Sequence, residues 1–104
     1  MRSAGKWTFP GGFVDLGESV DMAARREARE ELEIEIELGG LVGVYSRADD
    51  RIVLVVFAAR ALGTPRTTEE ATEVRAYAPD EIPWDELAFW STGQALRDLL
   101  DGTA

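Results

Sequence analysis

One stretch of the sequence changes its hydrophobic period from that of a helix to that of a strand without a break. Ser19 is a good helix N-cap, and the apolar residues after it recur at helical spacing as far as Leu32. Residues 33–38 then alternate strictly between glutamate and an aliphatic residue, which predicts a half-buried strand. The chain therefore has to combine helix and strand.

Further elements are expected on both sides of this stretch. They are a short strand over Lys6–Pro10, a break at Gly39-Gly40 before extended residues Leu41–Tyr45, a buried central strand over Ile52–Leu62, a short strand over Val74–Tyr77, and an amphipathic helix over Ser91–Leu100. Strands before and after a helix, followed by a terminal helix, predict an α/β (α+β) sandwich with a mixed sheet.

The chain is short and acidic. Its 104 residues suffice for a single domain, expected to span 1–104. The 20 acidic and 11 basic residues give a net charge of −9, which disfavours binding to nucleic acid polymers and to anionic membranes. Because the sequence contains neither an apolar run of membrane-spanning length nor a signal-peptide pattern, we expect a cytoplasmic protein.

Histidine and cysteine are both absent from the sequence. Their absence excludes disulfides, thiolate or imidazole nucleophiles, a Ser-His-Asp triad and a Cys/His zinc site. Any catalysis must therefore use carboxylates, arginines, hydroxyls or a hard metal ion.

Three glutamates are expected on one face of the predicted helix. Glu27, Glu30 and Glu31 are three and four residues apart, so their carboxylates repel one another, and Arg26 can neutralise only part of that charge. Most acidic runs on helices are solvated faces. Clustered carboxylates also suit Mg²⁺ or Mn²⁺, beside which the glycine loop at Gly11-Gly12 could place backbone groups.

The spacing of these residues resembles a known signature. Residues 12–34 match the Nudix hydrolase box at the following positions: Gly12, Glu18, Arg26-Glu27, Glu30-Glu31 and the aliphatic Ile34. The preceding residues 7–12, with their Pro-Gly-Gly, are similar to the family's usual approach to the box. The resemblance implies a Nudix-like α/β/α sandwich with a mixed sheet.

The resemblance also implies roles for the matching residues. The metal ligands would be the Gly12 carbonyl together with Glu27, Glu30 and Glu31. Arg26 would hold a ligand glutamate in place, and Glu18 would support the loop and the arginine.

The general base has to be a carboxylate, since there is no histidine. In the family, this base is either a box glutamate or a glutamate from a loop outside the box. Glu69, Glu70 and Glu73 lie in the corresponding loop here. We favour Glu70 over Glu69, Glu73 and Glu31, so the expected catalytic set is Arg26, Glu31 and Glu70.

Nudix hydrolases cleave nucleoside diphosphates linked to another moiety, with a divalent metal that activates water. We therefore expect a Mg²⁺-dependent enzyme, with Mn²⁺ as a substitute, acting on a small nucleotide. ADP-ribose or a related sugar nucleotide is the favoured substrate. The alternative is a truncated or diverged Nudix-fold module that binds nucleotide or metal without turnover.

The sequence departs from the family pattern in two places. Glu33 stands where the box normally has a glycine, so a left-handed residue at the helix exit would cost about 1 kcal/mol and alter the exit locally. Family members also usually carry two further sheet strands ahead of the glycine loop. Without them the strand over 52–62 would lack cover. Either the chain is a fragment or starts at an alternative site, or a second copy supplies the cover; we favour an N-terminally truncated domain that forms a homodimer.

Overall fold

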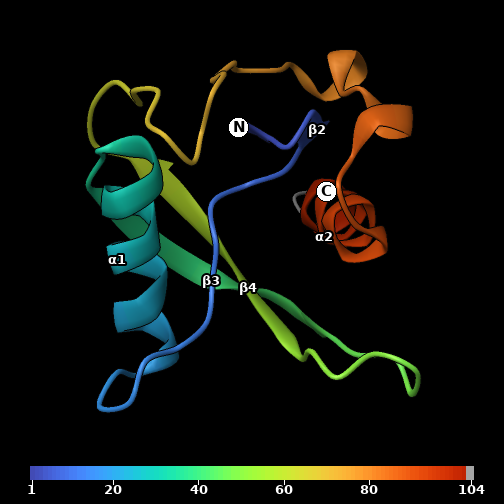
Figure 1. Ribbon diagram of the computed structural model, residues 1–104. Helices are drawn as coiled ribbons and strands as arrows, with labels where there is room; N and C mark the ends of the chain where they lie inside the picture. The colour runs from blue at the N-terminus through green and yellow to red at the C-terminus, as the bar shows by residue number, and fades with distance from the viewer. Residues whose placement is uncertain (103–104) are drawn as a thin grey trace.

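The computed structural model describes residues 1–102 and combines short strands with two long helices (Figure 1). The elements are β1 (Arg2–Ser3), β2 (Lys6–Trp7), α1 (Val20–Leu32), β3 (Ile36–Tyr45), β4 (Leu54–Ala61), the 3-10 turns η1 (Pro79–Glu81) and η2 (Trp84–Glu86), and α2 (Trp90–Gly102). Both helices pack against β3. The predicted α+β class is confirmed.

Helix α1 begins and ends at the expected residues. The Ser19 side chain accepts a hydrogen bond from the Met22 amide at 3.4 Å, so Ser19 is the N-cap. At the other end, Glu33 adopts the left-handed conformation (φ 51°, ψ 41°), and its amide donates to carbonyls of the last turn. The glutamate therefore takes the backbone conformation that favours glycine, and the helix exit keeps its capping bonds. The prediction of an altered exit is wrong, because the capping bonds hold Glu33 in the left-handed conformation.

This conformation predicts that Glu33→Gly stabilises the fold. Glycine meets no steric penalty at positive φ, so we expect the free energy of unfolding to rise by about 1 kcal/mol in chemical denaturation. Glu33→Ala is the matched control, because it removes the carboxylate but keeps the strained backbone. An equal gain in stability in both variants would mean that removal of the carboxylate charge, and not relief of backbone strain, causes the effect.

The β3–β4 hairpin is antiparallel; in Figure 1 it runs from behind α1 to the lower right, below α2. Strand β3 starts at Ile36, two residues after the buried Ile34, so the predicted strand over 33–38 begins later than its alternating pattern suggested. The expected break at Gly39-Gly40 is wrong, because β3 continues through it. The two glycines are absorbed by a register shift between Leu38 and Leu41, as in a β-bulge.

Strand β4 is shorter and less covered than the predicted buried strand over 52–62. It spans Leu54–Ala61 and pairs, within residues 1–102, with β3 alone. Its residues are half-buried or exposed, and Val53 just before it is 61% exposed. The prediction of a buried central strand is therefore wrong, because apolar composition does not determine how many neighbours a strand has.

The strands form two antiparallel pairs in place of one mixed sheet. The N-terminal pair joins β1 to β2, and the expected strand over 6–10 ends at Trp7. The parallel pairing in the described chain is a single bridge from Trp7 to Leu87. Residues 74–77 form no strand, so that prediction is wrong; Tyr77 instead packs its ring edge-on against Trp7 at 5.2 Å.

A small core joins α1 to the loop that follows β4. The fully buried Ala28 and Ala71 pack there with Leu32 and Ile34. A separate apolar cavity of about 280 Å³ lies among α1, α2, the hairpin and the segment at Phe9-Pro10. Helix α2 confirms the predicted helix over 91–100, with Ala95 buried. None of the helices described here is long and apolar enough to cross a membrane.

Candidate metal centre

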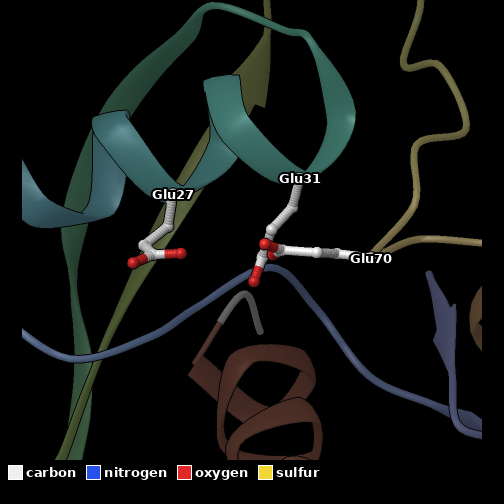
Figure 2. Close-up of side chains that lie close together, drawn as sticks. All are labelled: Glu27, Glu31 and Glu70. Carbon is white, nitrogen blue, oxygen red and sulfur yellow. The ribbon is translucent and has the colours of Figure 1, made fainter.

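Helix α1 places two glutamates one turn apart on the face that meets the glycine loop. Glu27 and Glu31 both project from this side (Figure 2), as their spacing requires. Glu70 reaches them from the loop after β4. One carboxylate oxygen from each of these three residues lies within 4.8 Å of the others. We call Glu27, Glu31 and Glu70 the carboxylate cluster.

Glu31 is the buried member of the cluster. It is 6% exposed, and its Oε2 accepts a hydrogen bond from the Gly11 amide at 2.9 Å. Burial is the main cause that raises the pKa of Glu31 to about 7, and the charges of Glu27, Glu70 and Glu30 raise it further against the Gly11 hydrogen bond. A proton or a cation is therefore favoured at this carboxylate near neutral pH.

Arg26 ties the loop before α1 to the helix. Its Nε donates to Glu18 at 2.8 Å, and its Nη2 donates both to Glu18 at 3.0 Å and to the Phe13 carbonyl at 2.9 Å. Asp15 lies 3.5 Å from the same guanidinium. These bonds lower the pKa of Glu18, chiefly through Arg26, and raise the pKa of Arg26 above its ordinary value.

The same guanidinium also orients Glu27. Arg26 Nη1 donates to Glu27 Oε1 at 2.8 Å and to Glu30 Oε2 at 3.0 Å. The Glu27 side chain is 12% exposed, whereas that of Glu30 is 52% exposed. Arg26 therefore fixes one oxygen of Glu27 inside the site and holds Glu30 at the surface.

The structure separates the expected site residues into two sets. Glu27 and Glu31 lie in the cluster, whereas Glu30 is outside it on Arg26. Of the three loop glutamates, Glu70 joins the cluster, Glu73 pairs with Arg2 at 3.5 Å and Glu69 is exposed. The loop places the Glu70 carboxylate close enough to Glu27 and Glu31 for the three to bind one metal ion. From the sequence, Glu70 is expected only as the general base and not as a metal ligand.

Gly12 lies directly against Glu27. A Cβ built on Gly12 would clash with the carboxylate of Glu27, most closely with Oε1. The glycine loop therefore leaves just enough room for this carboxylate, and its other glycine contributes the amide that binds Glu31. The Gly11 amide contact had not been assigned from the sequence, since spacing alone does not orient a loop amide.

Gly12→Ala is expected to displace the Glu27 carboxylate without unfolding the protein. Gly12 does not have a positive φ, so alanine can adopt its backbone conformation, and the clash falls on the end of a flexible side chain. We expect Mg²⁺ affinity to fall about tenfold, measured by calorimetric titration. Gly11→Ala is the matched control, because no atom lies within 4 Å of its added Cβ and it keeps the amide. Equal losses in both variants would contradict this steric explanation.

The cluster fits a hard divalent cation. Three carboxylates converge; Arg26 bonds to Glu27, and the N-terminal ammonium of Met1 interacts with Glu31, so the negative charge of the cluster is offset only in part. Oxygen ligands of this kind suit Mg²⁺ or Mn²⁺. Glu27, Glu31 and Glu70 are the side chains that would hold the ion.

Comparisons with known proteins show which family this chain resembles. The NUDIX domain family model matches residues 1–99. A MutT-like protein of Streptomyces ambofaciens is 38% identical over 99 residues, which are 94% of this chain and 63% of that protein. An ADP-ribose pyrophosphatase of Methanocaldococcus jannaschii is 32% identical over 90 residues, 82% of this chain and 52% of that protein.

A solved structure extends the similarity to the fold. The NUDIX hydrolase from Nitrosomonas europaea superposes with a TM-score of 0.83 at 34% identity, over 93% of this chain and 56% of that one. The chain thus spans between about half and two thirds of the length of these relatives. With the family model matched along almost its whole length and the glutamate box at the centre of the site, this chain belongs to the Nudix family.

Proposed function

We propose that this chain carries the catalytic centre of a Mg²⁺-dependent hydrolase. Its substrate would be a nucleoside diphosphate linked to another moiety, with ADP-ribose or a related sugar nucleotide favoured and Mn²⁺ able to replace Mg²⁺. The observation that carries the proposal is the carboxylate cluster, in which Glu31 is buried beside two further carboxylates. The similarity to an ADP-ribose pyrophosphatase supports the substrate class.

The proposed reaction is hydrolysis of a phosphoanhydride. A divalent ion held by Glu27, Glu31 and Glu70 would offset the charge of the diphosphate and make a nearby water more acidic. The water oxygen bonds to one phosphorus, and the bridging oxygen leaves with the other phosphate. A carboxylate has to take the proton of the water, because the chain has no histidine.

We assign the proton transfer to Glu70. Its side chain is exposed, whereas Glu31 is buried and already accepts the Gly11 amide. A carboxylate has two oxygens, so Glu70 can offer one to the ion and use the other to accept the proton and release it to solvent. Arg26 keeps Glu27 in place through its bond to Oε1.

The test is hydrolysis of a nucleotide panel with and without Mg²⁺. The panel contains ADP-ribose, NADH, nucleoside triphosphates and nucleotide sugars, and Glu31→Gln is assayed beside the parent chain. Turnover that needs both Mg²⁺ and Glu31 supports the proposal. If the folded protein binds Mg²⁺ and nucleotide but turns over nothing on the panel, the alternative of a binding module without turnover replaces it.

Homodimerisation stays a prediction. Leu41, Val44 and Val53 are each more than half exposed on or beside the β3–β4 hairpin, which favours a second copy as cover. Sedimentation at micromolar concentration tests this expectation, and a clean monomer would overturn it.

A further inference from the structure

Glu70 sits in an irregular segment, yet the cluster needs it at a defined place. The chain has no regular secondary structure between the end of β4 and η1, and Glu70 itself is exposed. Its carboxylate also faces two others, which repel it in the absence of a cation. Some contact within the loop must therefore hold this backbone against α1.

The loop is bound to the last turn of α1 by two hydrogen bonds. The Thr68 hydroxyl donates to the Glu31 carbonyl at 2.6 Å, across 37 residues of sequence. The Arg66 amide donates to the Leu32 carbonyl at 2.8 Å. Carbonyls at a helix C-terminus lack partners within the helix, so they are available to accept bonds from the loop.

Thr68 also closes the turn that contains Glu70. Its amide donates to the Ala71 carbonyl at 2.9 Å, and its hydroxyl accepts from the Ala71 amide at 3.2 Å. Ala71 is fully buried in the core beside Ala28 and Leu32. The Thr68 hydroxyl therefore bonds both to Ala71, at the far end of the turn, and to Glu31, whose carboxylate lies near that of Glu70.

We infer that Thr68 is a positioning residue, which holds Glu70 against Glu31 through its hydroxyl. The inference rests on the proposed function of the cluster as a metal centre. The burial of Ala71 and the Arg66 bond hold the loop near α1. The Thr68 hydroxyl, by contrast, contacts residue 31 itself and the turn around Glu70.

The test is a double-mutant cycle read out as Mn²⁺ affinity, by electron paramagnetic resonance of free Mn²⁺. The four proteins are the parent chain, Thr68→Val, Glu70→Gln and the double variant. Valine has nearly the shape of threonine but no hydroxyl. Thr68→Ser restores the hydroxyl, and Thr67→Val is a matched control at the exposed neighbouring threonine. Circular dichroism monitors folding, and Thr68→Ala replaces Thr68→Val if the latter does not fold.

We expect Thr68→Val to weaken Mn²⁺ binding about tenfold, as loss of a residue that orients a ligand does. Thr68→Ser and Thr67→Val should stay within about twofold of the parent chain. In the Glu70→Gln background, removal of the hydroxyl should add less than about twofold, because its effect runs through Glu70.

Three results would overturn the inference: an unchanged affinity in Thr68→Val, an equal loss in both backgrounds, or a Glu70→Gln variant with parent-like affinity. Failure of the proposed hydrolysis is a separate observation. It would appear as a parent chain that binds Mn²⁺ and shows this coupling, yet cleaves nothing on the nucleotide panel.

Discussion

Replacing Glu31 by glutamine is expected to abolish hydrolysis and, at the same time, to stabilise the metal-free protein at pH 8. Glutamine keeps the length of the side chain and an oxygen for the Gly11 amide, but it removes a ligand charge from the centre of the cluster. Charge stabilisation by a bound metal is worth several kcal/mol in the transition state, so we expect kcat to fall about a thousandfold.

The stability effect follows from the raised pKa of Glu31. Burial raises that pKa from 4.5 to about 7, so between these values the folded state binds more protons than the unfolded state. The free energy of unfolding of the metal-free protein therefore falls as the pH rises from about 4.5 to 7 and levels off above it. A shift of this size corresponds to about 3 kcal/mol.

Urea denaturation at pH 5 and pH 8 in a chelating buffer measures this effect. Because Glu31 ionises between these two pH values, the parent chain should be less stable at pH 8 than at pH 5. Glu31→Gln should not show this loss of stability. Glu69→Gln, at an exposed position of the neighbouring loop, is the matched control and should keep the parent slope. An identical pH slope in the parent and in Glu31→Gln would contradict the prediction.

Adding Mg²⁺ should remove most of the difference in stability between the two proteins at pH 8. The ion binds the folded cluster and stabilises the parent chain by about 2.7 kcal/mol at a hundredfold excess over Kd. Glu31→Gln should gain much less, and sodium chloride at matched ionic strength should do little to either protein. Equal melting shifts with both salts would argue against a metal site.

The second large effect is expected for Arg26→Ala. This variant removes at once the bonds to Glu18 and Phe13, which hold the loop before α1, and the bond that orients Glu27. We expect kcat to fall about a hundredfold and the Mg²⁺ concentration for half-saturation to rise, because a ligand loses its support. The melting temperature should also fall.

Arg26→Lys should recover little of the activity. A lysine ammonium is a point charge, and it cannot reproduce the planar fork that reaches three carboxylates and a carbonyl together. Arg25→Ala is the matched control on the same helix, where the arginine pairs with Asp21 at the surface. If Arg26→Ala and Arg25→Ala lost activity equally, the loss would come from a change in the helix and not from the hydrogen bonds of Arg26.

The helix that carries the site could be predicted closely, because its determinants are local. Ser19 supplies a capping oxygen, and Glu27 and Glu31 share a face by helical geometry alone. The left-handed conformation of Glu33 was not predicted, because the absence of glycine there suggests an altered helix exit. The strands were predicted less well, since the bulge at Gly39-Gly40 depends on the partner strand.

The sequence by itself thus determined the identity and spacing of the glutamates, the ends of α1 and the family to which the chain belongs. Only the tertiary structure decided that Glu70 and not Glu30 completes the cluster, that Glu31 is buried, and that Thr68 spans the loop and the helix. Helical spacing is a property of neighbouring residues. The approach of a loop to a helix, and the desolvation that raises the pKa of Glu31, depend on the packing of segments far apart in the chain.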